Sequence, residues 1–135
     1  MKHIQFCLVS MFLMLVAFSC YTSTRQISAE EVVEKLGATT LMSDATWTLR
    51  HSVTPEKEAP MEIPKECWVG SIGKLNPIRV YNHRFNLVVV LNSSETSENG
   101  LYISALQSSY GPRDGDDNFK FRLIERSVYA FERKK

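Results

Sequence analysis

"IRVYNHRFNLVVVLN", residues 78–92, is the stretch that decides the fold. It holds two runs rich in β-branched and aromatic residues, 78–83 and 85–92, and such residues favour a pleated sheet. The runs lie close enough to form a hairpin around His83 and Arg84. Three consecutive valines make the second run apolar on both faces, as expected of a strand at the centre of a sheet.

Further strands are predicted downstream of this hairpin. The segments "LYISAL" (101–106), "FKFRLIE" (119–125) and "SVYAFER" (127–133) are rich in strand-forming residues. The polar stretch 92–100 and the turn-rich stretch 107–118 are expected to be loops. We expect them, together with a proline-rich loop at 54–63, to provide contact surfaces, because loops commonly carry recognition on a rigid scaffold.

Upstream of the hairpin, "SAEEVVEKLG" (28–37) predicts a short helix. Ser28 and Glu31 have the spacing of a capping box, and Gly37 is well placed to end the helix. One apolar stripe recurs at helical spacing, formed by Ala29, Val32, Val33 and Leu36. We expect this stripe to pack on a core.

Two more segments complete the expected fold. The stretch "ATWTLRHSV" (45–53) alternates enough to predict a strand with Trp47 and Leu49 on one face. The stretch 64–77, between two prolines, predicts one or two helical turns. The sequence therefore predicts an α+β fold, with one or two short N-terminal helices and a mostly antiparallel meander sheet of about five or six strands.

The N-terminus differs in kind from the rest. Lys2 precedes an apolar stretch at about 6–18, which is too short to span the roughly 30 Å of hydrocarbon in a bilayer. The stretch matches the apolar region of an export signal that is removed from the mature chain. We therefore expect export.

The end of this stretch, "LVAFSC" (15–20), resembles the lipobox of bacterial lipoproteins. The resemblance implies that Cys20 is acylated and becomes the N-terminus of the mature chain. It predicts a signal peptide at 1–19, a tether at 20–27 and a single α+β domain at 28–135. The bulky Phe18 departs from the usual pattern, so a secreted or periplasmic soluble protein is the alternative.

The cysteines distinguish these two alternatives. Cys7 lies within the predicted signal, so the mature chain keeps Cys20 and Cys67. If Cys20 is acylated, Cys67 has no partner in the chain. If Cys20 is unmodified, a Cys20–Cys67 disulfide is allowed in an oxidising compartment.

Length and charge exclude several classes of protein. The chain has 135 residues, which suits one domain. Its 16 Lys and Arg balance 15 Asp and Glu, so it lacks the basic excess of a nucleic-acid binder. Basic and aromatic residues interleave in "RVYNHRF" and "FKFRLIER", which suggests a binding platform, but the alternation of strand faces explains the same pattern.

An acidic loop motif raises the question of calcium. "DGDDNFKFRLIE" (114–125) has oxygen ligands at the first, third, fifth and twelfth places of an EF-hand loop. The sixth place, which requires glycine, is Phe119, and the following residues alternate as a strand. We therefore reject an EF-hand and keep only a loose loop site formed by Asp114, Asp116 and Asp117.

Catalytic signatures are weak. Cys67 with His51 or His83 is the available thiol and base combination, and it would make the protein a small extracytoplasmic hydrolase. No paired spacing typical of zinc ligands occurs, and no cofactor is expected. The favoured function is a lipid-anchored envelope module without its own catalysis that binds another envelope protein and no nucleic acid. A ligand-binding sheet face is a further alternative.

Overall fold

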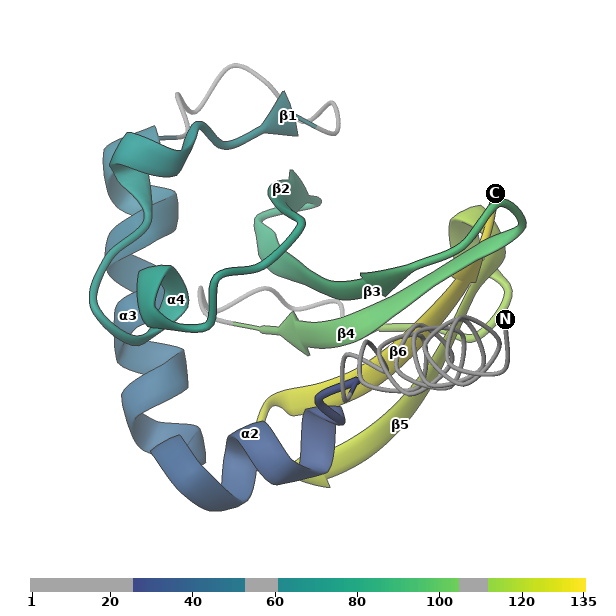
Figure 1. The fold of residues 1–135 in the computed structure, drawn as a ribbon, viewed down its shortest axis with the longest axis horizontal. Coiled ribbons are helices and arrows are strands. Elements are labelled where there is room, and N and C mark those ends of the chain that lie inside the picture. The colour runs from purple at the N-terminus through teal and green to yellow at the C-terminus, as the bar shows by residue number, and fades with distance from the viewer. Residues whose placement is uncertain (1–25, 53–60, 105–111) are drawn as a thin grey trace, which may run out of the picture.

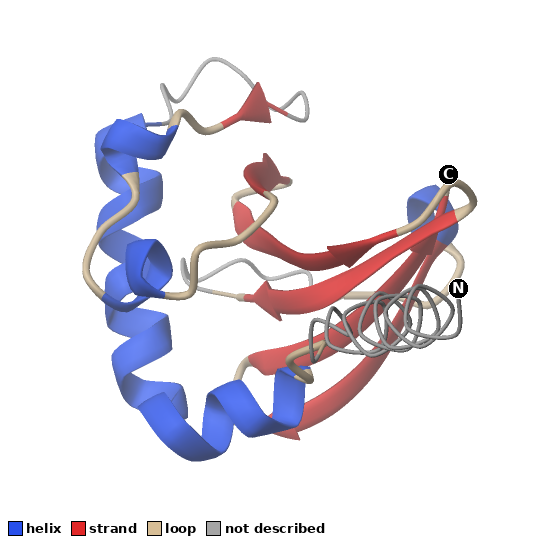
Figure 2. Ribbon diagram, viewed as in Figure 1, coloured by secondary structure: helices blue, strands red, loops and turns tan. Residues whose placement is uncertain are grey.

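The computed structural model describes residues 26–52, 61–104 and 112–135. Its helices and strands form the predicted α+β fold with one six-stranded antiparallel sheet (Figures 1 and 2). In chain order the elements are α2 (Ala29–Leu36), α3 (Ala38–Ser52), β1 (Met61–Glu62), η1 (Lys65–Cys67), α4 (Ser71–Lys74), β2 (Arg79–His83), β3 (Asn86–Ser93), β4 (Ser97–Ile103), η2 (Asp116–Asn118), β5 (Phe119–Glu125) and β6 (Val128–Lys134).

The first predicted helix is confirmed. The side chain of Ser28 accepts a hydrogen bond from the amide of Glu31 at the start of α2, as an N-cap should. Gly37 ends the helix with a positive φ of 80°. The apolar stripe packs into the core, where Val32 and Val33 are buried.

The predicted strand at 45–53 is wrong, because residues 45–52 belong to α3. Trp47 is 50% exposed whereas Leu49 is buried, so the two do not share a face. The buried residues of the helix recur at helical spacing, and they are Ala38, Leu41, Ala45, Thr48 and Leu49. Their small and hydroxylated members hid the apolar stripe from the sequence analysis.

The predicted helical turns at 64–77 are confirmed as η1 and α4. Asp44 of α3 holds α4 in place, since its Oδ2 accepts hydrogen bonds from the amide (2.8 Å) and the hydroxyl (2.6 Å) of Ser71. Gly70 lies against this carboxylate with a φ of 52°, and an added Cβ would lie 2.7 Å from Asp44 Oδ2. The short helix is thus fixed on α3.

The strand order is β1-β2-β3-β4-β6-β5. The predicted hairpin joins β2 to β3, and its turn residues Arg84 and Phe85 both have positive φ, as in tight hairpins. The predicted loop at 92–100 is shorter than expected, because β4 begins at Ser97. The final hairpin inserts β6 beside β4 and leaves β5 at the edge.

The sheet curls strongly, as Figure 1 shows. A bulge between Val90 and Asn92 of β3 lies opposite the stretch that contains Gly100 of β4. A Cβ at Gly100 would collide with the carbonyl oxygen of Val89 and lie 2.8 Å from the amide nitrogen of Leu91. The bulge and the missing side chain therefore let the two strands approach at the bend.

Each face of the sheet has its own core. The helix-side core is almost wholly aliphatic and lies between the sheet and helices α2 and α3. The opposite side, which we call the aromatic face, is formed by Tyr81, Val88, Val90, Tyr102, Phe119 and Phe131, with Phe121 and Tyr129 packed against them. Among the described residues, no helix is long and apolar enough to cross a membrane.

Candidate functional site

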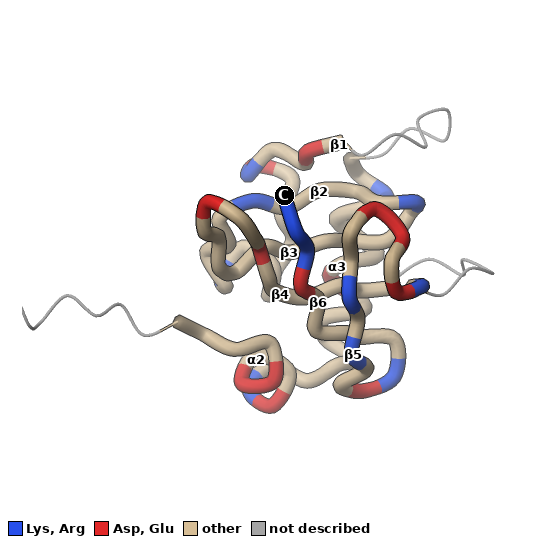
Figure 3. Tube along the Cα trace, turned by 90° about the vertical axis from the view of Figure 1, so that its right-hand side faces the viewer, with Lys and Arg blue, Asp and Glu red and all other residues tan. Residues whose placement is uncertain are grey.

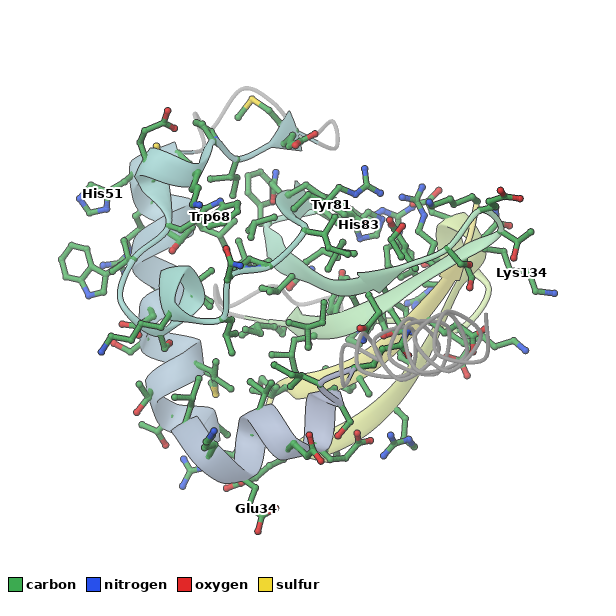
Figure 4. All side chains as sticks on the ribbon, viewed as in Figure 1. Glu34, His51, Trp68, Tyr81, His83 and Lys134 are labelled. Atoms are coloured by element: carbon green, nitrogen blue, oxygen red, sulfur yellow. The ribbon has the colours of Figure 1, made fainter. Side chains whose placement is uncertain are left out.

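The structure places Cys67 and His83 of the predicted thiol site on opposite faces of the sheet. Cys67 is half-buried and packs against the helix-side core, whereas His83 is buried on the aromatic face. His51 projects outward from α3, where its ring lies 5.4 Å from that of Trp47 (Figure 4). Within the described residues, no hydrogen bond joins Cys67 to either histidine, whose ring nitrogens bond to Trp47, Tyr102 and Asp117.

Several predictions fall on residues that the structure does not describe. Cys20, the predicted lipidation site, lies outside the described residues, as does the predicted signal peptide at 1–19. The same holds for parts of the loops predicted at 54–63 and 107–118. The anchor and these contact surfaces stay predictions.

The acidic residues of the predicted loop site are each bound to groups of the protein. Asp114 accepts a hydrogen bond from the amide of Phe121 (2.8 Å), Asp116 pairs with Arg84 (3.1 Å), and Asp117 pairs with His83 (2.7 Å). Within the described residues, no group of three or more His, Cys, Asp or Glu could hold a metal ion. These carboxylates therefore organise the η2 turn.

The aromatic face closes on itself because of the curl. Three strands lie between β2 and β5, so four spacings of about 4.8 Å would separate these strands by roughly 19 Å in a flat sheet. The ring centroids of His83 (β2) and Phe119 (β5) are only 5.0 Å apart. The interior of the curl is consequently filled by side chains from both of its ends.

A hydrogen-bonded chain runs through this interior. His83 Nδ1 lies 3.0 Å from the hydroxyl of Tyr102, and Nε2 lies 2.7 Å from Asp117 Oδ2. Asn86 donates to the same hydroxyl (3.0 Å) and accepts from Ser104 (3.0 Å). The chain links β2, β3 and β4 to the η2 turn.

The hydrogen bonds define the proton positions in this chain. The hydrogen bond from His83 is the main cause that lowers the pKa of Asp117, so this carboxylate is an acceptor at neutral pH. Nε2 of His83 therefore donates to Asp117, and the hydroxyl of Tyr102 lies against Nδ1. Every member has a partner, and the chain fastens η2 to the sheet.

The tyrosines of the aromatic face are poor candidates for a nucleophile or a base. Burial is the main cause that raises the pKa of Tyr81 to about 12 and that of Tyr102 to about 12. Both side chains are buried, and both stay protonated at neutral pH. Their hydroxyls serve as hydrogen-bonding groups of the interior.

A pair of arginines around one buried carboxylate borders the aromatic face. Glu98 of β4 is 1% exposed, and its Oε2 accepts a hydrogen bond from Nη2 of Arg79 of β2. Its Oε1 lies 3.6 Å from Nη1 of Arg133 of β6 and 3.2 Å from the hydroxyl of Tyr81. The arginine side chains are 36% and 32% exposed. We call Arg79, Arg133 and Glu98 the arginine rim.

Aromatic rings and the η2 turn orient the two guanidinium groups. Arg79 lies over the ring of Tyr81 at 5.0 Å, and Arg133 lies over the ring of Phe119 at 5.1 Å. Arg133 also donates to the backbone carbonyl of Asp117 (3.2 Å). Figure 3 shows the basic end of β6 beside the acidic turn that precedes β5. The arginine rim is thus held in place by contacts within the protein.

Sequence reasoning missed the arginine rim. Its members come from three strands, and a single sequence does not show which strands pair. Glu98 lay in a stretch that the sequence predicted to be a polar loop. The interleaving in "RVYNHRF" was a signal for Arg79, but strand alternation explained it equally well.

No family model, curated protein or solved structure matches this chain.

Proposed function

We propose that this protein is a binding module without its own catalysis, held at the bacterial cell envelope by a lipid on Cys20, and that it binds another envelope protein. The lipobox-like "LVAFSC" at 15–20 and the apolar stretch before it support the anchor. Two or three acyl chains would hold the protein stably, where a single chain gives marginal binding.

The tether sets where the partner must be. Its eight residues, 20–27, span at most about 29 Å when fully extended. The folded domain therefore stays within one domain diameter of the membrane surface. A partner in the same membrane or in the adjacent wall meets it at high effective concentration.

The observation that carries the binding proposal is the contrast within the aromatic face. The histidine, tyrosine and asparagine of its interior are buried and bonded to one another, whereas Arg79 and Arg133 are about one-third exposed. Catalysis would require an accessible nucleophile or base near a substrate. Fixed, partly exposed arginines are typical of recognition surfaces.

Site-specific crosslinking in the native host tests this proposal. A photoreactive residue replaces Glu62 of β1, which is exposed and pairs with Tyr81 beside Arg79, and a matched variant carries it in place of the exposed Lys35 of α2. We expect one abundant envelope protein to crosslink from position 62 and much less from position 35. Equal yields from both positions, or no product, would contradict the proposal.

The same preparation tests the anchor. Mass spectrometry of the N-terminal peptide should find an acylated Cys20, and Cys20→Ser should release the protein from the membrane fraction. An unmodified Cys20 joined to Cys67 by a disulfide would contradict the anchor and indicate a secreted protein.

A further inference from the structure

The guanidinium groups of the arginine rim retain hydrogen-bond donors. Each guanidinium offers five N–H groups. Arg79 uses Nη2 on Glu98, and Arg133 uses Nε on the carbonyl of Asp117 and Nη1 on Tyr81 and Glu98. Among the described residues, Nε and Nη1 of Arg79 and Nη2 of Arg133 have no acceptor. Both side chains reach solvent, so an incoming acceptor can approach these donors.

Positive and negative groups are mixed around the arginine rim. Two arginines meet one buried carboxylate at the rim, and Glu62 and Asp117 also act on Arg79 and Arg133 through their charges. Next to the arginine rim, Arg84 forms ion pairs with Asp116 and Asp117. These two carboxylates repel a second negative charge nearby. A surface with many negative charges, such as nucleic acid or an anionic bilayer, is therefore disfavoured relative to one isolated anionic group.

We propose that the arginine rim is a carboxylate-binding site, which takes the side chain of an Asp or Glu, or a terminal carboxylate, of the partner protein. This inference deepens the proposed function and rests on it for the source of the carboxylate. A planar carboxylate matches the forked donors of a guanidinium in a way that a round anion does not. The stacking on Tyr81 and Phe119 keeps both forks oriented, so little side-chain entropy is lost on binding.

A titration of the purified full chain in neutral detergent tests the site without any partner. Acetate is the probe, and the Nε–Hε signals of Arg79 and Arg133 are followed by NMR against chloride at equal ionic strength. We expect saturable shifts of these two signals with acetate and only small, uniform shifts with chloride. Shifts that spread equally over all arginines, or that match those with chloride, would overturn the inference.

Variants identify the groups responsible. Arg79→Gln should weaken acetate binding at least about tenfold, because a charge-assisted hydrogen bond is lost. Arg79→Lys keeps the charge but not the forked donors, so its affinity for acetate should lie between those of wild type and Arg79→Gln. Lys35→Gln on α2 removes one positive charge elsewhere and should bind as wild type does. Equal weakening by Lys35→Gln, or none by a folded Arg79→Gln, would contradict a specific site.

Inorganic phosphate provides the competing chemistry. If phosphate saturates the same signals at lower concentration than acetate, the site is a phosphate site and the carboxylate assignment is wrong. The acetate titration and the crosslinking test different proposals. Acetate binding with no crosslinked partner would refute the proposed function alone, and a crosslinked partner without acetate binding would refute the carboxylate site alone.

Discussion

The two faces of the sheet are stabilised in different ways. On the helix side, aliphatic residues pack against α2 and α3, and burial of apolar area supplies the stability. On the aromatic face, the curl brings together rings, a buried carboxylate and a hydrogen-bonded histidine. The first face should be insensitive to pH and salt. The aromatic face is also bordered by the partly exposed charged groups of the arginine rim, which makes it the candidate for function.

The largest expected effect comes from a substitution at the bend that curls the sheet around the aromatic face. Gly100→Ala would place a Cβ on the carbonyl oxygen of Val89, and only a backbone shift relieves this collision. We expect a loss larger than the about 1–3 kcal/mol of ordinary overpacking, measured by urea denaturation. Gly73→Ala in α4 is the control, because its nearest contact is an ordinary 3.6 Å and alanine favours a helix. Equal stability of the two variants would show that Gly100 does not set the curl.

On the helix side, Leu41→Ala should cost about 2–5 kcal/mol, since Leu41 of α3 is fully buried. Trp47→Ala on the outer side of the same helix should change the free energy of unfolding by less than about 0.5 kcal/mol. Chemical denaturation at two salt concentrations measures both variants. A strong salt dependence of the loss in Leu41→Ala would contradict the claim that burial of apolar area stabilises this core.

Alkaline pH should act on the aromatic face. The pKa values of Tyr81 and Tyr102 are each raised to about 12 from an ordinary value of 10. Folding therefore favours their protonated forms, and this contribution is complete below pH 10 and is lost as the pH rises from 10 to 12. Each tyrosine contributes at most about 2–3 kcal/mol. Tyrosinate absorbance should show two groups that ionise late, and early ionisation of all five tyrosines would contradict their burial.

One buried polar residue of the helix side has an unpaired side chain among the described residues. Asn82 of β2 lies two residues from Val80 and thus on the same face, and it is fully buried without a hydrogen-bond partner for Nδ2 or Oδ1 among the described residues. Asn82→Leu should raise the free energy of unfolding by about 1–3 kcal/mol, because an unpaired buried amide is costly. Thermal denaturation measures the change. A clear loss of stability would show that the amide has a structural partner.

The smallest expected effect concerns the attachment of η2 to the aromatic face. The hydrogen bond from His83 lowers the pKa of Asp117, so the contribution of the charged carboxylate is present above its ordinary pKa and is lost as the pH falls below about 4. Asp117→Asn should show a smaller loss of stability between pH 5 and pH 3 than wild type does. Glu34→Gln on α2 should follow wild type, and the unfolding midpoint in urea at each pH decides between these outcomes.

Local signals in the sequence determined much of the fold. The capping residues Ser28 and Gly37 bounded α2 correctly, because a cap depends on neighbours in the chain. The hairpin of β2 and β3 and the two-sided burial of the central valines followed from composition, since Val89 packs on the helix side and Val88 on the aromatic face. These features need no knowledge of distant residues.

The tertiary structure decided the rest. Residues 45–52 became part of a helix because packing on the sheet favoured a stripe of small and hydroxylated residues over weak strand alternation. The arginine rim depends on the insertion of β6 beside β4 and on the curl at Gly100, which bring Arg79, Glu98 and Arg133 together. Strand order and curvature arise from contacts between residues far apart in the chain, so only the folded molecule specifies them.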